Sequence, residues 1–424
     1  MIENNAKIIT SVPGPCSQKL LEKRKQYVSG AVYSSANIFI QEAEGALIKD
    51  IDGNVYLDFA CSSTNIGHCP DEVKVSITNQ AQHYIHASFL TIPYEPYIAL
   101  AERLSELSPI EDGKVILTNS GLYALLDAVR IARGYTGKRG IVFLENDENK
   151  ELFSDVYEIP GPKYMNKTDG KEVESYMEEQ AEYFRKVLEE SVCQGGISCI
   201  VLEPVQLHDK IIPLNKIYVQ KIQKLCEEYH TLLIMDESQS GMARTGALFA
   251  TEQFGIVPDF LILSRSLATG IPIGCIIGKP HLMEKKVCRF IENGMGGNPL
   301  ACKAALTVLD NMEKYQLEVR SRALGEYINE FLAKMKERYK VIGSVCGIGA
   351  LAAIELVKED GVTPYPEIVL GIIEYCLQKG VIICQPKEQS NCIQLFPSLV
   401  MTMEQVYYGM QIIEEAISKY EFAV

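Results

Sequence analysis

The sequence lacks several features that would assign a protein to a class at once. Its 424 residues contain no internal repeat, no low-complexity tract and no apolar run long enough to span a membrane. Basic residues are in deficit, with 41 Lys and Arg against 55 Asp and Glu, which gives a formal net charge of -14. Nonspecific binding to nucleic acid or to an anionic membrane needs clustered Lys and Arg, so this charge argues against both. We expect small-molecule or protein partners.

Cysteine is present, but not in the patterns that define a metal or disulfide framework. The 13 cysteines include no CxxC pair and no Cys/His ligand spacing. Their scattered placement is typical of reduced thiols used as small core residues rather than of a zinc site or a set of disulfides. The N-terminus also lacks a basic segment followed by an apolar one. We therefore expect a cytoplasmic protein with no metal site.

Strand-like and helix-like stretches alternate through the middle of the chain. Apolar stretches predict strands over 115–119, 140–144, 200–203, 232–236 and 260–263. Helical periodicity follows residue 121 and covers 218–229. This alternation predicts an α/β fold with a mostly parallel sheet covered by helices. Between two of these strands, residues 146–171 are polar and interrupted by Pro160 and Pro162, which predicts a mobile loop.

The two ends of the chain have a different organisation. Residues 46–58 predict a hairpin with its turn at Asp52-Gly53. Near the other end, strands over 349–356, 381–384 and 392–395 accompany helices near 316–338, 365–379 and 403–419. We expect an N-terminal arm and hairpin over 1–58 that joins the small domain, a large domain over 59–315 and a smaller α+β C-terminal domain over 316–424.

Four short motifs stand in an order known from one enzyme family. They are Thr-Asn-Ser-Gly at 118–121, Glu-Pro-Val-Gln at 203–206, Asp-Glu-Ser-Gln at 236–239 and Arg-Thr-Gly at 244–246. This order resembles the class III (omega-amino acid or 4-aminobutyrate type) aminotransferases, which are pyridoxal-phosphate enzymes of fold type I. The resemblance extends over almost the whole chain. It implies a homodimer whose large domain binds the cofactor and transfers an amino group from an amino acid or amine to a 2-oxo acid.

The resemblance also implies roles for individual residues on the cofactor side. Ser120, Gly121 and Leu122 would hold the cofactor phosphate at a helix start, although Ser-Gly is also an ordinary N-cap pair. Asp236 would bind the pyridine nitrogen, with capping of the following loop as the alternative role. Gln239 would lie beside the phenolic oxygen, and Ser238 replaces an apolar residue under the ring.

Several positions depart from the family pattern. Arg265 stands where the family has the lysine that binds the cofactor covalently. A guanidinium with a pKa above ~12 neither forms a stable imine nor shuttles a proton near neutral pH. On the substrate side, Glu203 normally pairs with an arginine near the C-terminus, and that position is Gln394 here. The aromatic ring expected after Leu144 is missing, and Gly294 replaces a threonine that reaches the neighbouring subunit's phosphate.

These departures leave alternative functions open. The chain is either a class III aminotransferase or a catalytically degenerate homologue that binds a vitamin B6 phosphate or another phosphorylated ligand. A noncatalytic partner subunit and a structural protein without a cofactor are further alternatives. The missing lysine predicts that pyridoxal 5'-phosphate or pyridoxamine 5'-phosphate, where bound, is held noncovalently.

Overall fold

The fold is described here from a computed structural model covering residues 5–32, 34–161, 171–208, 210–284, 294–387 and 390–421. Its contacts divide the chain into two compact units. The central unit comprises Glu72–His208 and Ile212–Tyr315, and the terminal unit comprises Met1–Asp71, Asp209–Ile211 and Gln316–Val424. Among the described residues, no helix has the length and apolar character needed to cross a membrane.

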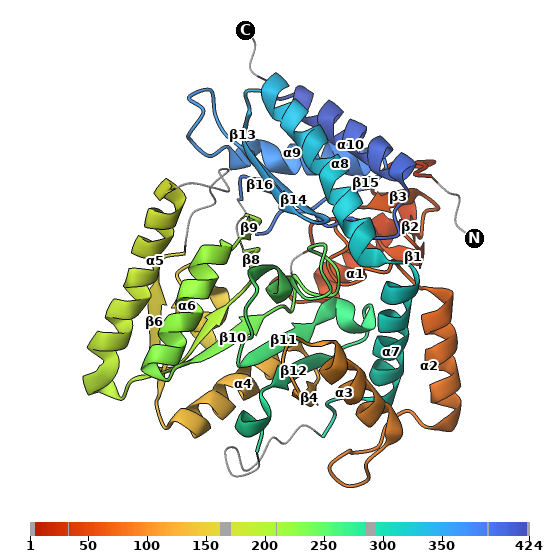
Figure 1. The fold of residues 1–424 in the computed structure, drawn as a ribbon. Helices are drawn as coiled ribbons and strands as arrows, with labels where there is room; N and C mark the ends of the chain where they lie inside the picture. The colour runs from red at the N-terminus through yellow and green to blue at the C-terminus, as the bar shows by residue number, and fades with distance from the viewer. Residues whose placement is uncertain are drawn as a thin grey trace. The chain divides into compact units, whose positions relative to one another are not determined.

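A seven-stranded sheet forms the middle of the central unit (Figure 1). In spatial order its strands are β4 (Lys114–Thr118), β12 (Gly274–Gly278), β11 (Phe260–Ser264), β10 (Leu232–Asp236), β7 (Ile197–Leu202), β5 (Gly140–Leu144) and β6 (Val156–Ile159). Strand β12 runs antiparallel to both of its neighbours, and the other six strands are parallel to one another. The predicted α/β fold with a mostly parallel sheet is confirmed.

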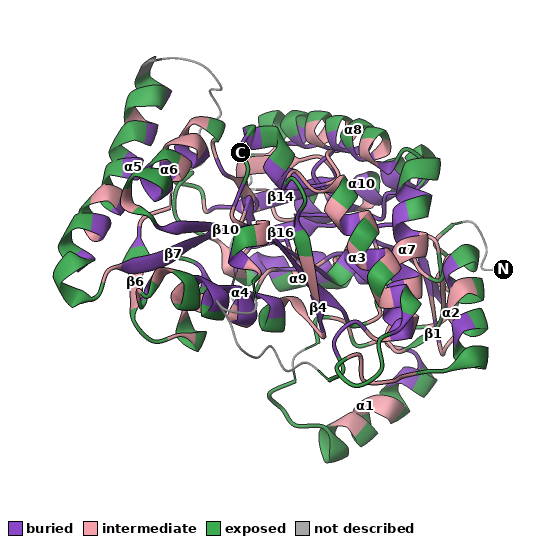
Figure 2. Cartoon of the chain, turned by 60° about the horizontal axis from the view of Figure 1, so that its bottom comes forward, coloured by how far each residue is buried: buried purple, intermediate pink, exposed green. Residues whose placement is uncertain are grey.

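Helices cover this sheet because its strands are apolar on both faces. Every residue of β5, β7, β10, β11 and β12 is buried. Helix α4 (Gly121–Thr136) packs small residues such as Ala124, Ala128 and Ala132 against one face, which lets the helix approach closely. Figure 2 shows the buried strands and the exposed outer sides of the helices. The other helices of this unit are α2 (Asp71–His83), α3 (Glu95–Leu107), α5 (Lys171–Glu190), α6 (Lys216–Tyr229) and α7 (Pro299–Lys314).

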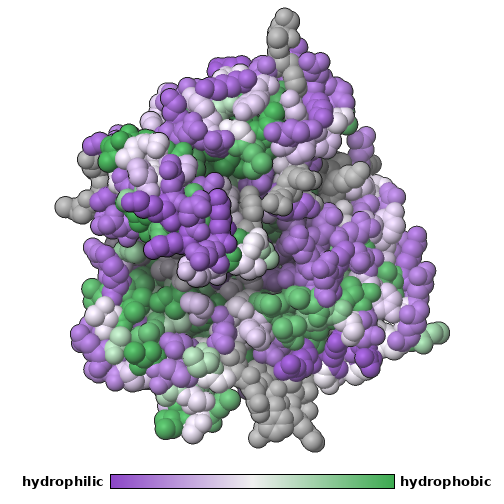
Figure 3. Space-filling model, turned by 180° about the vertical axis from the view of Figure 1, so that it is seen from behind, coloured by the Kyte–Doolittle hydropathy of each residue, from purple (hydrophilic) through white to green (hydrophobic). Residues whose placement is uncertain are grey.

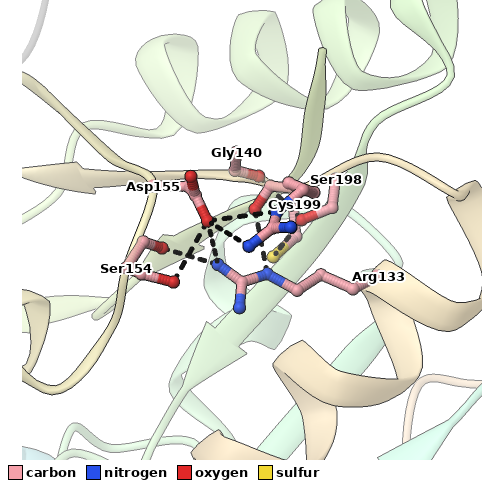
Figure 4. Close-up of polar contacts among 7 residues, drawn as sticks. Arg133, Gly140, Ser154, Asp155, Ser198 and Cys199 are labelled. Atoms are coloured by element: carbon pink, nitrogen blue, oxygen red, sulfur yellow. Dashed lines mark hydrogen bonds and ion pairs between the residues drawn. The ribbon is translucent and has the colours of Figure 1, made fainter. Parts of the chain in front are cut away.

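Polar contacts at the amino ends of β5 and β7 tie α4 to the sheet (Figure 4). Arg133, in the last turn of α4, donates from Nη2 to the Ser154 carbonyl at 2.6 Å and lies 3.8 Å from Asp155 Oδ2. The Ser198 hydroxyl donates to the Gly140 carbonyl at 2.7 Å. These contacts lie at the amino edge of the sheet, opposite the carboxyl ends of β5 and β7.

In its described residues, the terminal unit contains two smaller sheets and four α-helices. One sheet has the order β1 (Ile40–Glu44), β2 (Leu47–Asp50), β3 (Val55–Asp58) and β15 (Val381–Ile382). The other joins β13 (Ile342–Ile348), β14 (Leu351–Leu356) and β16 (Cys392–Leu395). The helices are α1 (Pro15–Tyr27), α8 (Leu317–Arg338), α9 (Val369–Gln378) and α10 (Met403–Ser418).

The predicted hairpin with its turn at Asp52-Gly53 is confirmed by the antiparallel pairing of β2 with β3. Asp50 Oδ1 accepts the backbone N–H groups of Asp52 and Asn54, at 2.9 and 2.8 Å. Gly53 has a φ of 87°, a conformation that favours glycine. The turn therefore depends on one buried carboxylate as well as on the glycine.

The loop predicted over 146–171 is wrong in its first part. Residues Glu148–Leu152 form a short 3-10 helix, η1, and β6 extends the sheet beside β5. The sequence does not predict β6 because the strand has only 4 residues, is not continuously apolar and is followed directly by Pro160. Residues 162–170 of the predicted loop lie outside the described residues. Strand β12 was also not predicted, since it is short and has glycine at both ends.

Candidate active site

The carboxyl ends of the parallel strands bring most of the predicted site residues to one edge of the central sheet. Ser120 follows β4, Arg265 follows β11, Asp236 ends β10 and Glu203 follows β7. Since β11, β10 and β7 are consecutive in the sheet, Arg265, Asp236 and Glu203 stand in a row along this edge. In open α/β sheets, ligands bind outside the carboxyl ends of the strands.

The start of α4 forms one end of this row. Ser120 is the N-cap residue, and its hydroxyl accepts the Tyr123 N–H at 3.4 Å. The Gly121 N–H donates to Ser264 Oγ at 3.0 Å. A Cβ atom on Gly121 would lie only 2.5 Å from Ser238 Oγ, so the loop after β10 packs directly on this glycine. Leu122, the next helical residue, is exposed.

Asp236 is a buried carboxylate, with 6% of its surface exposed. Its Oδ1 accepts the Ser238 N–H at 2.9 Å. Burial raises the pKa of Asp236 above its usual range, and the Asp147 carboxylate adds to this rise, whereas Ser238 and the positive charge of Arg265 oppose it. Ser238 Oγ is buried without a hydrogen-bond partner among the described residues, and Gln239 beside it is half-buried. A cationic ring nitrogen is the kind of partner that such a carboxylate can stabilise.

Arg265 is the first residue of the short 3-10 helix η4 (Arg265–Ala268). Its φ is 48°, in the left-handed region that non-glycine residues occupy at a cost. The residue is exposed, whereas Ser266 and Leu267 after it are buried. The backbone therefore directs this one side chain out of the core, and its charge acts on Asp236.

A second group of side chains in the central unit was not predicted as a site. It consists of Asp147, Glu203 and His208, and we call it the acid–histidine cluster. His208 Nε2 lies 3.3 Å from Glu203 Oε2 and 3.9 Å from Asp147 Oδ1. The cluster borders a cavity of about 10 Å³ whose lining also includes Leu144, Asn146, Val201 and Gln206.

Burial and mutual charge shift the pKa values of all three side chains in the acid–histidine cluster. Burial raises the pKa of Glu203 and of Asp147. The Glu203 carboxylate beside His208 raises the pKa of that imidazole to about 9. Asp147 belongs to the polar segment that replaces the expected aromatic ring after Leu144. The acidic residue three positions after this buried strand is a sequence signal for a site at the sheet edge.

Gln394 is the one predicted site residue that belongs to the terminal unit. It lies on β16 with 3% of its surface exposed, and its N–H donates to the Cys384 carbonyl at 2.9 Å. An amide at this buried position carries no charge. It therefore lacks the permanent positive charge with which an arginine would hold a carboxylate.

Comparison with known proteins agrees with this arrangement. The family model for class III aminotransferases matches residues 29–149 and 145–417. A probable 4-aminobutyrate aminotransferase of Bacillus subtilis (strain 168) is 32% identical over 420 residues, which cover 93% of this chain and 96% of the relative. The 5-aminovalerate aminotransferase DavT of Pseudomonas aeruginosa is 30% identical, covering 95% of this chain and 99% of the relative.

Solved structures give the same result for the fold. Acetylornithine aminotransferase from Elizabethkingia anophelis superposes with a TM-score of 0.78 at 25% identity, covering 95% of this chain and 99% of that one. A transaminase from the marine bacterium Virgibacillus superposes with a TM-score of 0.85 at 24% identity, covering 95% and 98% of the two chains. This chain therefore belongs to the class III aminotransferase family, whose members use pyridoxal phosphate.

Proposed function

We propose that this protein holds pyridoxal phosphate or pyridoxamine phosphate noncovalently and does not carry out the transamination of its family. The observation that carries the proposal is Arg265, which follows β11 at the position that resembles that of the family lysine. A guanidinium remains protonated at neutral pH, so it is neither a nucleophile nor a proton carrier. Its positive charge can still act on Asp236, where it opposes the rise in pKa that burial causes.

The residues at the sheet edge fit the cofactor at its two ends. Asp236 would bind the ring nitrogen, because it is a buried carboxylate with a raised pKa that a cationic partner would stabilise. Ser120, Gly121 and Leu122 would hold the phosphate at the start of α4, where the helix dipole favours an anion. When bound, the cofactor would supply an electron sink, because its pyridinium ring can accept electron density from the substrate carbon that carries the amino group.

Charges around the site also disfavour the family's acceptor substrate. Three carboxylates, on Asp236, Glu203 and Asp147, lie in the central unit at this edge, against the cations of Arg265 and His208. A 2-oxo acid carries a carboxylate of its own, and like charges at close range raise the cost of binding. We therefore propose that the small-molecule ligand carries a cationic amino group that these carboxylates attract, as an amino acid or a phosphorylated amine does and a 2-oxo acid does not.

Ordinary transamination is the second candidate function. The identity to relatives named for 4-aminobutyrate and 5-aminovalerate aminotransferase activity supports it. Under this alternative, the chain would transfer an amino group to a 2-oxo acid with a base other than residue 265. Turnover in a coupled assay would distinguish the two candidates.

A matched pair of variants tests the proposed binding. Asp236→Asn keeps an oxygen to accept the Ser238 N–H but removes the charge. Asp259→Asn makes the same change at the amino end of β11, on the opposite edge of the sheet, where Asp259 Oδ2 accepts the Leu233 N–H at 2.8 Å. Hydrogen bonds to charged groups contribute about 1.5–3 kcal/mol, so Asp236→Asn should weaken pyridoxamine phosphate binding by roughly 10- to 150-fold in calorimetry. Equal binding by both variants would contradict the proposal.

We also propose that the protein forms a homodimer. The segment between α2 and α3 exposes several large apolar residues, among them Ile85, Leu90 and Ile92 at 62%, 61% and 66% exposure. Hydrophobic residues also gather into patches on the surface seen in Figure 3. Such patches are typical of surfaces covered by another chain. Sedimentation at micromolar concentration should give a mass near twice 47.3 kDa, and a monomer at all concentrations would contradict the proposal.

A cytoplasmic location is part of the same proposal. The twelve cysteines in the described part of the chain are all free thiols, as expected for a reducing compartment.

A further inference from the structure

The acid–histidine cluster offers a set of metal-binding atoms to which the proposed function gives no ligand of their own. Asp147 follows β5, Glu203 follows β7, and His208 comes two residues after β8 (Val205–Gln206). Their side chains offer a carboxylate oxygen each from Asp147 and Glu203 and a ring nitrogen from His208, all within 4.8 Å of one another. Strands β5 and β7 are neighbours, so the sheet itself holds the two carboxylates together.

The distances within the cluster suit a small cation. Bonds from Zn²⁺ to imidazole nitrogen or carboxylate oxygen are about 2.0–2.2 Å long, which at a tetrahedral angle places two donor atoms about 3.4 Å apart. The distance from His208 Nε2 to Glu203 Oε2 is 3.3 Å, which matches this value. The distance from Nε2 to Asp147 Oδ1 is 3.9 Å, so one side chain would need to move by about half an ångström.

The His208 ring nitrogen itself lacks a satisfactory partner. Nε2 is buried and makes no hydrogen bond of acceptable geometry, despite its distance of 3.3 Å from Glu203. Buried polar atoms nearly always have a hydrogen-bond partner. A buried ring nitrogen without one, beside two carboxylates that can bind a metal, therefore points to a missing ligand. The cavity of about 10 Å³ beside it has room for a single water-sized species.

A further carboxylate, from Glu148, lies near the second ring nitrogen of His208. His208 Nδ1 lies 3.9 Å from Glu148 Oε2. Histidines that bind metals commonly direct the second ring nitrogen toward a carboxylate, which fixes the ring orientation and the tautomer. Glu148 would have this positioning role here.

We propose that the acid–histidine cluster binds one divalent first-row cation, with Zn²⁺ as the best match. Asp147 Oδ1, Glu203 Oε2 and His208 Nε2 are its protein ligands, and water completes the coordination. Mixed nitrogen and oxygen ligands suit Zn²⁺ and neighbouring ions better than Mg²⁺ or Ca²⁺, which prefer oxygen alone. The competing arrangement is an ion pair between a protonated His208 and Glu203, which needs no metal.

The test uses the full chain after treatment with a chelator. Calorimetry with Zn²⁺ should give one cation per chain, and Co²⁺ should produce visible absorption bands typical of four- or five-coordinate cobalt. Glu203→Gln and His208→Ala should each weaken Zn²⁺ binding by at least about 100-fold, since each removes a direct ligand. Glu151→Gln changes an exposed carboxylate of the same segment and should bind as the wild type does.

Glu148→Gln provides an intermediate case, because second-layer partners typically change metal affinity by about 10- to 100-fold. Circular dichroism would check that each variant is folded. If His208→Ala does not fold, two measurements still test the metal site. They are the number of Zn²⁺ ions bound per wild-type chain and the Zn²⁺ affinity of the isosteric Glu203→Gln variant. The proposal would be overturned if the wild-type protein bound no cation at millimolar Zn²⁺. It would also be overturned if a folded Glu203→Gln variant bound Zn²⁺ as tightly as the wild type.

Discussion

The Asp58–His68 pair in the terminal unit allows a quantitative prediction of stability. His68 Nε2 lies 2.8 Å from Asp58 Oδ2, and the side chains are 19% and 7% exposed. Burial lowers the pKa of His68, but the hydrogen bonds to Asp58 and Cys61 outweigh this and raise it from 6.5 to about 10. The pair therefore stabilises the fold fully below pH 6.5, and this contribution is lost as the pH rises toward 10.

The size of the effect follows from the shift. The rise of the His68 pKa from 6.5 to about 10 corresponds to a ceiling of about 5 kcal/mol. We expect about half of this, because the pair is partly solvated. In the wild type, Asp58 Oδ1 accepts the Ala60 N–H at 2.8 Å. The Asp58→Asn variant keeps an oxygen that can accept this N–H but loses the negative charge. It should lower the free energy of unfolding by about 2–3 kcal/mol at pH 7 and by less than about 1 kcal/mol at pH 9.

Urea denaturation of wild type and variant at pH 6, 7, 8 and 9 measures this difference. The loss should shrink steadily as the pH rises, since the histidine of the unfolded chain loses its proton over this range while the folded His68 still holds its own. His68→Gln, which removes the titrating group, should show the same pH trend relative to the wild type. A loss that is the same at pH 6 and pH 9 would refute the ion-pair argument.

Three further changes probe the site of the central unit. Gly121→Ala should destabilise the fold by about 1–3 kcal/mol in thermal denaturation, because its Cβ would lie 2.5 Å from Ser238 Oγ; adding Ser238→Gly should recover part of the loss, and no recovery would contradict the contact. Arg265→Lys alone should not restore efficient transamination across a panel of amino donors, because Gln394 still lacks the charge that holds a substrate carboxylate; turnover within about 1–1000 per second would disprove this. Asp236→Ala should abolish detectable pyridoxamine phosphate binding in calorimetry, and binding equal to the wild type would show that the pocket serves another ligand.

Much of the central sheet was predictable because its strands are continuously apolar and end at recognisable residues. The stretch 232–236 combines four apolar residues with Asp236, so its strand and the carboxylate at its end follow from local sequence alone. Strand β12 and edge strand β6 could not be predicted in the same way. Their short sequences acquire a strand conformation only by pairing with β4, β11 and β5.

The acid–histidine cluster could not be predicted for a different reason. Asp147 and His208 are separated by 61 positions in the numbered sequence, with a helix and several strands between them. Only the order of the strands, which places β5 beside β7, brings Asp147 to Glu203. Strand order is a long-range property of packing, and no local pattern in the sequence encodes it.

The central claim is that the cofactor binds without a covalent bond to the protein, and one measurement tests it directly. The protein is incubated with pyridoxal phosphate, treated with borohydride and mapped by peptide mass spectrometry, with excess pyridoxamine phosphate added in a parallel sample. We predict no phosphopyridoxyl adduct in the peptide spanning 263–270, and none on any lysine that pyridoxamine phosphate protects. A stoichiometric adduct on a lysine, prevented by pyridoxamine phosphate, would contradict the account and restore ordinary transaminase chemistry.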